Sequence, residues 1–200
     1  MRTQLFAAVA AASLLFANAA PAAGALKTAI FAGGCFWSAE HDIEHTKGVT
    51  DVVVGYAGGT TKNPNYDHHD GFLESIKVTY DPSVISYAQL VDAFFHHIDP
   101  TDPSGQFCDQ GPSYRTAVFT ADPQEKAEAE LIKSQVGQQL RMPIKTMILG
   151  PTTFWMGESY HQHYAEKNPG NYMAYRIGCG RDRSLKAVWA KPPGGNERGR

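Results

Sequence analysis

The chain has 200 residues, with 18 Lys or Arg, 20 Asp or Glu and a net charge of −2 at pH 7. This length allows one domain or two small ones, and an apolar content of 42% can build a core without disulfide support. There is no basic stripe, and no basic arm beyond a short C-terminal tail, which argues against a nucleic-acid partner.

The first 23 residues have the features of a cleaved secretory signal. Arg2 gives a positive start, an apolar run follows, and the segments ANA and APA at 17–22 fit the A-x-A cleavage pattern. The apolar run is too short to span a bilayer. We therefore expect a signal peptide over 1–23, one domain over 24–190 and a flexible tail over 191–200. The mature chain is expected to be soluble and exported to the periplasm.

From residue 27 onward, short apolar runs alternate with segments of helical periodicity. A strand over 27–32 ends in a glycine pair, and a helix over 35–45 follows it. Strands are then predicted over 51–59, where the chain runs into a glycine-rich loop, and over 73–82, where Asp-Pro ends the strand. The second of these strands alternates apolar and polar side chains, as expected for a sheet with one buried face.

The second half of the chain is predicted to contain, in order, a helix from Ser86, a strand over 114–120, a helix over 122–139, a strand over 145–150, a short helix over 158–162 and a last helix over 183–189. The segment 98–113 has several prolines and glycines and is predicted to be a functional loop. This order favours an α+β fold over a doubly wound sheet. We expect a two-layer α/β sandwich, a ferredoxin-like plait around a mixed sheet, with a loop-rich C-terminal region.

Cys35 lies between a glycine pair and an aromatic pair, in the segment GGCFW, at the start of a predicted helix. The unpaired N–H groups and the dipole at a helix start favour the thiolate. These residues therefore suggest an exposed nucleophile with a lowered pKa beside a small apolar pocket. They fit a buried structural cysteine about as well, because free cysteines are commonly buried.

The segment GCFWSAE resembles the G-C-F-W-x-x-E signature of the A-type peptide-methionine (S)-S-oxide reductases. The resemblance continues through VVVGYAGG, NPNY, ESIKVTYDP, DQGPSYRTAVF and ESYHQHYAEKNP, and so covers most of residues 27–170. It implies an oxidoreductase that reduces methionine-S-sulfoxide, protein-bound or free, to methionine. In that reaction Cys35 would attack the sulfoxide sulfur and become a sulfenic acid.

The resemblance also implies the residues that assist Cys35. Glu74 matches the acid that protonates the sulfoxide oxygen, and burial is expected to raise its pKa towards neutrality. Without the resemblance it would be interpreted as a solvated strand carboxylate. Tyr66 and Tyr114 match the two phenols that hydrogen-bond the oxygen as it becomes more negative. Asp109 matches the acidic residue that orders the hydrogen bonds of the site.

Phe36 and Trp37 are predicted to form the pocket for the substrate methyl group, and core packing is the alternative role for both rings. Gly34 either lends its backbone to the substrate or only permits the turn. Phe72 departs from the family pattern, because a His commonly stands at this position, two residues before the acid. We expect a drier site and a more strongly raised pKa of Glu74 as the result.

Recycling requires a second cysteine, which forms a disulfide with the oxidised Cys35. Relatives often carry it in a glycine-rich C-terminal tail, but residues 191–200 contain no cysteine. We assign Cys179 as the resolving residue because its flanking glycines permit mobility, with Cys108 as its rival. A thioredoxin or thioredoxin-fold protein would then supply electrons to a monomer that has no bound cofactor.

Histidines provide the competing interpretation, an exported metal-binding protein. His41 and His45 are four residues apart on the predicted first helix, near Cys35, and a borderline metal ion can use such a set. The spacing is weakly specific, and neither C-x-x-C nor H-E-x-x-H is present. We therefore predict no metal site.

Overall fold

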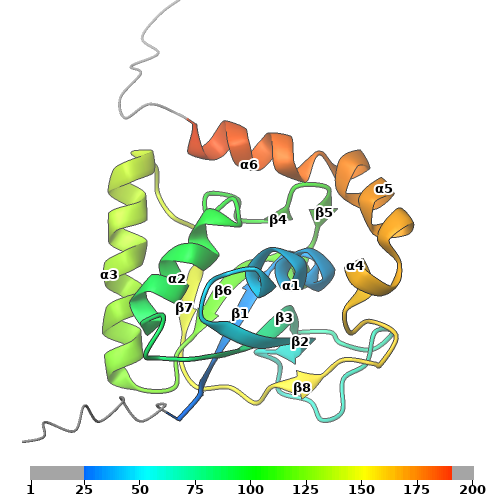
Figure 1. The fold of residues 1–200 in the computed structure, drawn as a ribbon, viewed down its shortest axis with the longest axis horizontal. Coiled ribbons are helices and arrows are strands. Elements are labelled where there is room, and N and C mark those ends of the chain that lie inside the picture. Colours follow the sequence, from blue (N-terminus) through cyan, green and yellow to red (C-terminus); the bar gives the residue numbers. More distant parts are fainter. Residues whose placement is uncertain (1–24, 191–200) are drawn as a thin grey trace, which may run out of the picture.

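The computed structural model describes residues 25–190, so the predicted signal peptide and C-terminal tail lie outside the described residues. A six-stranded mixed sheet has the order β7-β6-β1-β3-β2-β8 (Figure 1). Its strands are β1 Lys27–Gly33, β2 Val49–Ala57, β3 Leu73–Tyr80, β6 Thr116–Phe119, β7 Met147–Leu149 and β8 Trp155–Met156. A separate small hairpin pairs β4 Gly105–Gln106 with β5 Asp109–Gln110.

The helices are α1 Phe36–Glu44, α2 Tyr87–His96, α3 Pro123–Leu140, α4 Tyr164–Lys167, α5 Pro169–Cys179 and α6 Arg181–Trp189, and a 3-10 turn, η1, spans Pro112–Tyr114. The helix starts follow the sequence signals. Ser86 and Gln89 form a capping box at α2, and Asp122 caps α3. Within 25–190, no helix combines the length and the apolar character that crossing a membrane requires.

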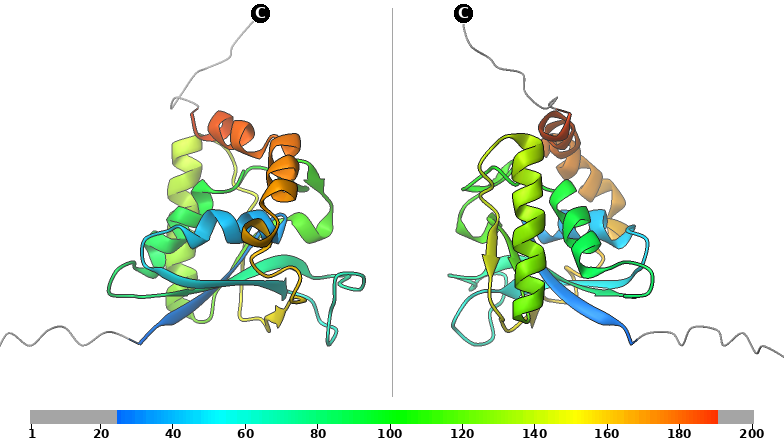
Figure 2. Two further views of the ribbon diagram at one scale, coloured as in Figure 1. Left: turned by 45° about the vertical axis from the view of Figure 1, so that its right-hand side comes forward. Right: turned by 90° about the vertical axis from the view of Figure 1, so that its left-hand side faces the viewer.

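The central part of the sheet is a ferredoxin-like plait. The chain runs β1-α1-β2-β3-α2-β6, and these strands lie in the order β6-β1-β3-β2 with antiparallel neighbours. Figure 2 shows α1 on the same side of the sheet as α5 and α6. The α+β class and the plait predicted from the sequence are therefore confirmed.

The main core lies between this sheet and its helices. Phe31 of β1 stacks on Phe94 of α2 with ring centroids 4.6 Å apart, and Ile76 and Val78 of β3 are fully buried beside them. Burying each such side chain contributes roughly 1.5–3 kcal/mol. Glu74 has the same parity as Ile76 and Val78 on β3, so it projects from the helix-covered face.

The opposite face of the sheet holds a smaller cluster of Ala32, Ala57, Leu73, Ala117 and Phe119. Beyond the plait, the pairing of β7 with β6 is parallel, and β8 pairs with β2 in antiparallel fashion. The sheet is therefore mixed, as predicted.

The C-terminal region differs from the sequence prediction. Residues 164–179 form two helices, α4 and α5, rather than a loop, and Pro169 begins α5 instead of breaking the chain. The predicted last helix over 183–189 is confirmed as α6. The predicted helix over 158–162 is a set of turns, since the Gln162 side-chain amide pairs with both backbone groups of Val54 on β2. The predicted loop over 98–113 also contains the β4–β5 hairpin and the start of η1.

Candidate active site

The turn between β1 and α1 presents Cys35 at the end of a central strand. Gly34 has a φ of +82°, and a Cβ at this position would lie 2.5 Å from the Cβ of Gln106. Only glycine fits such a conformation and such a close approach. Cys35 then caps α1, and its carbonyl accepts the N–H groups of Ser38 and Ala39 at 3.1 and 3.2 Å.

Cys35 is a free thiol that is only 7% exposed. Burial raises its pKa to about 12, and the negative charge of Glu74 adds to this effect. The predicted exposed thiolate with a lowered pKa is therefore wrong, because burial and the Glu74 charge outweigh the helix start. At that helix start, Glu74 Oε2 accepts the Phe36 N–H at 3.0 Å.

Glu74 is 2% exposed and lies opposite Tyr56 in the β2–β3 register. Burial raises its pKa to about 8, although the hydrogen bond from Phe36 acts in the opposite direction. The predicted direction of this pKa shift is confirmed. Phe72 packs face-on over Gly59, where an added Cβ would lie 2.3 Å from its ring. Its effect on the Glu74 pKa stays a prediction.

Tyr66 and Tyr114 approach the same site from two loops. Tyr66 is 40% exposed, and its backbone N–H donates to Glu158 at 2.8 Å. Tyr114 ends η1 and is half-buried. Burial raises the pKa of both phenols, and the charges of Glu74 and Cys35 raise it further. The structure thus brings both predicted phenols close to Cys35 and Glu74.

The two aromatic residues after Cys35 have different environments. Phe36 is 1% exposed and belongs to the main core, so the alternative of core packing holds for it. Trp37 is half-buried and stacks on Tyr164 with ring centroids 3.8 Å apart. Its indole N–H donates to His161 Nδ1 at 3.1 Å. Trp37 is therefore the less buried of the two rings.

His161 is a site residue to which the sequence analysis gave no role. It is 2% exposed, and its ring lies 4.9 Å from Phe36 and 4.7 Å from Tyr66. Burial lowers its pKa, and because Nδ1 accepts from Trp37, the proton of the neutral ring is on Nε2. This N–H has no hydrogen-bond partner within the described part of the chain. The only sequence signal was its position in the ESYHQHY segment.

Cys108 and Cys179 are joined in a disulfide with a Cα–Cα distance of 5.0 Å. The bond connects the β4–β5 hairpin to the end of α5, so both rivals for the resolving role belong to one pair. Cys179 is the last residue of a helix rather than part of a mobile glycine segment, since Gly180 ends α5 in the left-handed conformation. Its sulfur lies 3.9 Å from the carboxylate of Asp109.

Tyr175 was also missed, because α5 itself was not predicted. Its hydroxyl donates a short hydrogen bond to Asp109 Oδ2, and its ring meets Trp37 edge-on with centroids 6.1 Å apart. Asp109 thus accepts a hydrogen bond from a tyrosine that the sequence did not reveal, and its role in ordering the site stays a prediction.

Comparison with known proteins agrees with this geometry. The sequence pattern of the family described as peptide methionine sulfoxide reductase matches residues 27–193. The peptide methionine sulfoxide reductase MsrA 2 of Caulobacter vibrioides is 46% identical over 187 residues, which cover 90% of this chain and 95% of that protein. The chain belongs to the peptide methionine sulfoxide reductase family.

Solved structures support the same assignment. The methionine sulfoxide reductase A of Corynebacterium diphtheriae superposes with a TM-score of 0.67 at 33% identity, covering 72% of this chain and 76% of that one. Mxr1 of Saccharomyces cerevisiae in complex with Trx2 gives a TM-score of 0.50 at 26% identity, covering 76% and 91%. The protein is an oxidoreductase that reduces methionine sulfoxide, as the sequence resemblance predicted.

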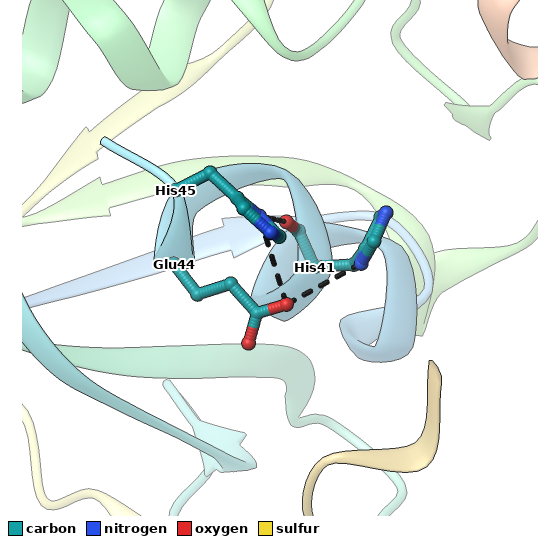
Figure 3. A group of neighbouring side chains, drawn as sticks. All are labelled: His41, Glu44 and His45. Atoms are coloured by element: carbon teal, nitrogen blue, oxygen red, sulfur yellow. Dashed lines mark hydrogen bonds and ion pairs between the residues drawn. The ribbon is translucent and has the colours of Figure 1, made fainter. Parts of the chain in front are cut away.

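The reductase also brings His41, Glu44 and His45 together, at the far end of α1 (Figure 3). One carboxylate oxygen of Glu44 lies 3.3 Å from His41 Nδ1 and 3.7 Å from His45 Nδ1. At 1.5 Å per residue along the helix axis, His41 and His45 follow Cys35 by about 9 and 15 Å.

Proposed function

We propose that this reductase acts on the S epimer of methionine sulfoxide and that Cys35 is its nucleophile. One observation carries the proposal. A free thiol shares a buried site with a carboxyl group, Glu74, whose pKa is raised to about 8 and which can therefore carry a proton near neutral pH. The A-type family resemblance supports the choice of epimer.

Reduction of the sulfoxide needs a nucleophile, a proton donor and an apolar pocket for the methyl group. The Cys35 sulfur attacks the sulfoxide sulfur while Glu74 gives its proton to the oxygen. The hydroxyls of Tyr66 and Tyr114 donate to the same oxygen as negative charge develops on it. The thiol proton lost from Cys35 balances the proton that Glu74 delivers. The products are methionine and a sulfenic acid on Cys35.

The methyl group of the substrate would rest against Trp37, the partly open wall, with Phe36 behind it. The turn at Gly34 exposes the sulfur to this pocket. The backbone N–H of Phe36 donates a hydrogen bond to Glu74 and so holds its carboxyl group beside the reacting atoms. We expect both free and peptide-bound methionine sulfoxide to fit, because only the end of the side chain needs to enter.

Recycling then uses the two remaining cysteines. The Cys179 thiol attacks the sulfenic sulfur of Cys35, which forms a disulfide and releases water. Cys108 next attacks the Cys179 sulfur, which restores the Cys35 thiol and leaves the Cys108–Cys179 disulfide. The disulfide present in the structure supports this end point, and the order with Cys108 first is the rival. The similarity to Mxr1 in complex with Trx2 supports a thioredoxin-fold donor.

We also propose that the enzyme is exported as a monomer to an oxidising compartment such as the periplasm, where oxidised envelope proteins would be its substrates. The A-x-A pattern within residues 1–23 supports export. Amino-terminal sequencing of the protein recovered from the producing cells would reveal a start near residue 20 or 23. An intact Met1 would refute export.

Turnover with separated epimers tests the proposed function. The enzyme, thioredoxin and its reductase would be supplied with either the S or the R epimer of a methionine sulfoxide peptide, and methionine would be quantified. We expect turnover of the S epimer alone, and none in Cys35→Ser. Turnover of the R epimer, or full activity of Cys35→Ser, would overturn the proposal.

A further inference from the structure

The end of α1 carries a metal-binding sequence pattern that oxygen transfer does not use. The segment HDIEH, residues 41–45, has the form H-x-x-E-H, which is the zinc motif H-E-x-x-H with its middle residues reversed. In both forms two histidines stand four residues apart, so they lie on one face of a helix and can bind the same ion. From the histidine spacing alone we predicted no metal site, but the arrangement of the side chains favours one.

The structure brings one ligand atom from each of three residues close together (Figure 3). Glu44 Oε1 lies 3.3 Å from His41 Nδ1 and 3.7 Å from His45 Nδ1, and the three ligand atoms are all within 4.8 Å of one another. Ligands about 2.0–2.2 Å from a tetrahedral zinc ion lie about 3.4 Å from one another. Small side-chain rotations therefore suffice for the three residues to share one ion, which would replace the 2.9 Å contact of His45 Nδ1 with the His41 carbonyl oxygen.

The His41 ring is held in place by its neighbours. It meets the buried Tyr172 of α5 edge-on with ring centroids 5.0 Å apart, and it meets His45 edge-on at 5.2 Å. The side chains of His41 and Glu44 are only 36% and 32% exposed, whereas that of His45 is 70% exposed. Two of the three ligands are thus partly ordered before an ion arrives, which reduces the entropy that binding would cost.

The three side chains line a hollow in the surface between α1 and α4. Ala165 and Glu166 of α4 complete the lining of this hollow, which contains two carboxylates and, among the described residues, neither Lys nor Arg. Two imidazoles together with negative charge suit a borderline divalent metal ion. Three protein ligands also leave the fourth position of a tetrahedral ion open to water from the hollow.

We propose that His41, Glu44 and His45 form a binding site for a borderline divalent metal ion, Zn²⁺ or Cu²⁺. Two nitrogen ligands disfavour Ca²⁺ and Mg²⁺, which take oxygen ligands. Because the ligands lie in the last turns of α1, the bound ion would clamp the end of the helix that begins after Cys35. No cysteine takes part, so the site is independent of the oxygen transfer and of the recycling disulfide.

Calorimetric titration with Zn²⁺ tests the site without a measurement of turnover. The full chain would carry no affinity tag, Cys35→Ser would remove the free thiol, and the other two cysteines would remain in their disulfide, so no thiolate competes for the ion. We expect one tightly bound Zn²⁺ per chain. Binding should be at least about tenfold weaker in Glu44→Gln and in His45→Ala, and lost in His41→Ala/His45→Ala. Absence of binding, or unchanged affinity in the double variant, would overturn the inference.

His96→Ala is the matched control. His96 also lies on a helix beside a carboxylate four residues away, with Asp92 at 3.7 Å, but it belongs to no group of three metal-binding side chains in the part of the chain that the structure describes. This variant should keep the affinity of its parent for Zn²⁺. A loss as large as that of His45→Ala would show that exposed histidines bind the ion without a site, and would overturn the inference.

Cu²⁺ identifies the ligands directly. With one equivalent of Cu²⁺, the electron paramagnetic resonance spectrum should show coupling to two imidazole nitrogens in the parent and to one in His45→Ala. This substitution is at the most exposed of the three positions, so misfolding cannot explain the change. Identical spectra of the two proteins would place the ion elsewhere and overturn the inference.

Discussion

The pH dependence of oxygen transfer follows from the pKa values of two groups. Burial raises the pKa of Glu74 to about 8 and that of Cys35 to about 12. The pair therefore holds two protons below about pH 8 and one proton between about pH 8 and 12. The reactive form, a thiolate beside a protonated carboxyl, holds one proton. The rate should therefore rise with pH up to about 8 and then level off.

The magnitude can be worked out from these values. At pH 7 about a tenth of the Cys35–Glu74 pairs hold one proton, and at pH 9 about nine-tenths do, so the rate should rise about tenfold over this interval. A carboxyl with an ordinary pKa of 4.5 would give a flat profile from pH 6 to 9. Single-turnover formation of methionine by the reduced enzyme measures the chemical step without the recycling steps. A flat profile would refute the assigned protonation of the site.

Glu74→Gln identifies the group that titrates. The amide keeps an acceptor for the Phe36 N–H but carries no proton for the sulfoxide oxygen. We expect the single-turnover rate to fall about 10²–10³-fold, and the rise of the rate up to about pH 8 to disappear from the pH profile. The variant Cys35 should also be alkylated faster, because the Glu74 charge no longer raises its pKa. Glu40→Gln is the matched control at another buried carboxyl, and its rate should still rise with pH up to about 8.

Four further predictions concern stability, substrate binding and recycling. Glu40→Gln should increase the free energy of unfolding at pH 8 by up to about 3 kcal/mol but not at pH 4, measured by urea denaturation. Burial raises the pKa of Glu40 to about 7, so wild-type stability is complete below pH 4.5 and decreases as the pH rises to 7; an unchanged difference at the two pH values would contradict this. Gly34→Ala should lower the free energy of unfolding by about 1–3 kcal/mol, because Gly34 has a positive φ and the Gln106 side chain lies close. An unchanged midpoint of urea denaturation would contradict this. Trp37→Leu should raise KM about tenfold while changing kcat less, since it removes the open wall of the pocket, and an unaltered KM would place the substrate elsewhere. Cys108→Ser should complete one turnover and lose turnover supported by thioredoxin, whereas sustained turnover would show that the second exchange step is unnecessary.

Much of the fold follows from local patterns in the sequence. The alternation in β3 set its buried face, and the signals at Ser86 and Asp122 set the starts of α2 and α3. The last helix was predicted, but α4 and α5 were not, because the proline that occupies the first position of α5 was interpreted as part of a loop. Packing of α5 against α1, through the Arg176–Asp42 pair, is a tertiary interaction without a local signal.

The residues of the site were also predicted only in part from the sequence. The resemblance identified Cys35, Glu74 and both phenols, and the structure brings them together. It did not identify Tyr175, since α5 was missing from the prediction. The state of the Cys35 thiol was also mispredicted. Its position at a helix start suggested a thiolate, but burial and nearby carboxylates outweigh the helix dipole in the folded chain.

The transfer of oxygen from the substrate to Cys35 is the central claim, and isotope labelling tests it most directly. The Cys108→Ser/Cys179→Ser variant would receive one equivalent of the S epimer carrying oxygen-18, and the Cys35 peptide would be analysed by mass spectrometry. We predict one methionine per enzyme and a Cys35 sulfenic acid that carries the label. Methionine formed without labelled oxygen on Cys35 would contradict the account.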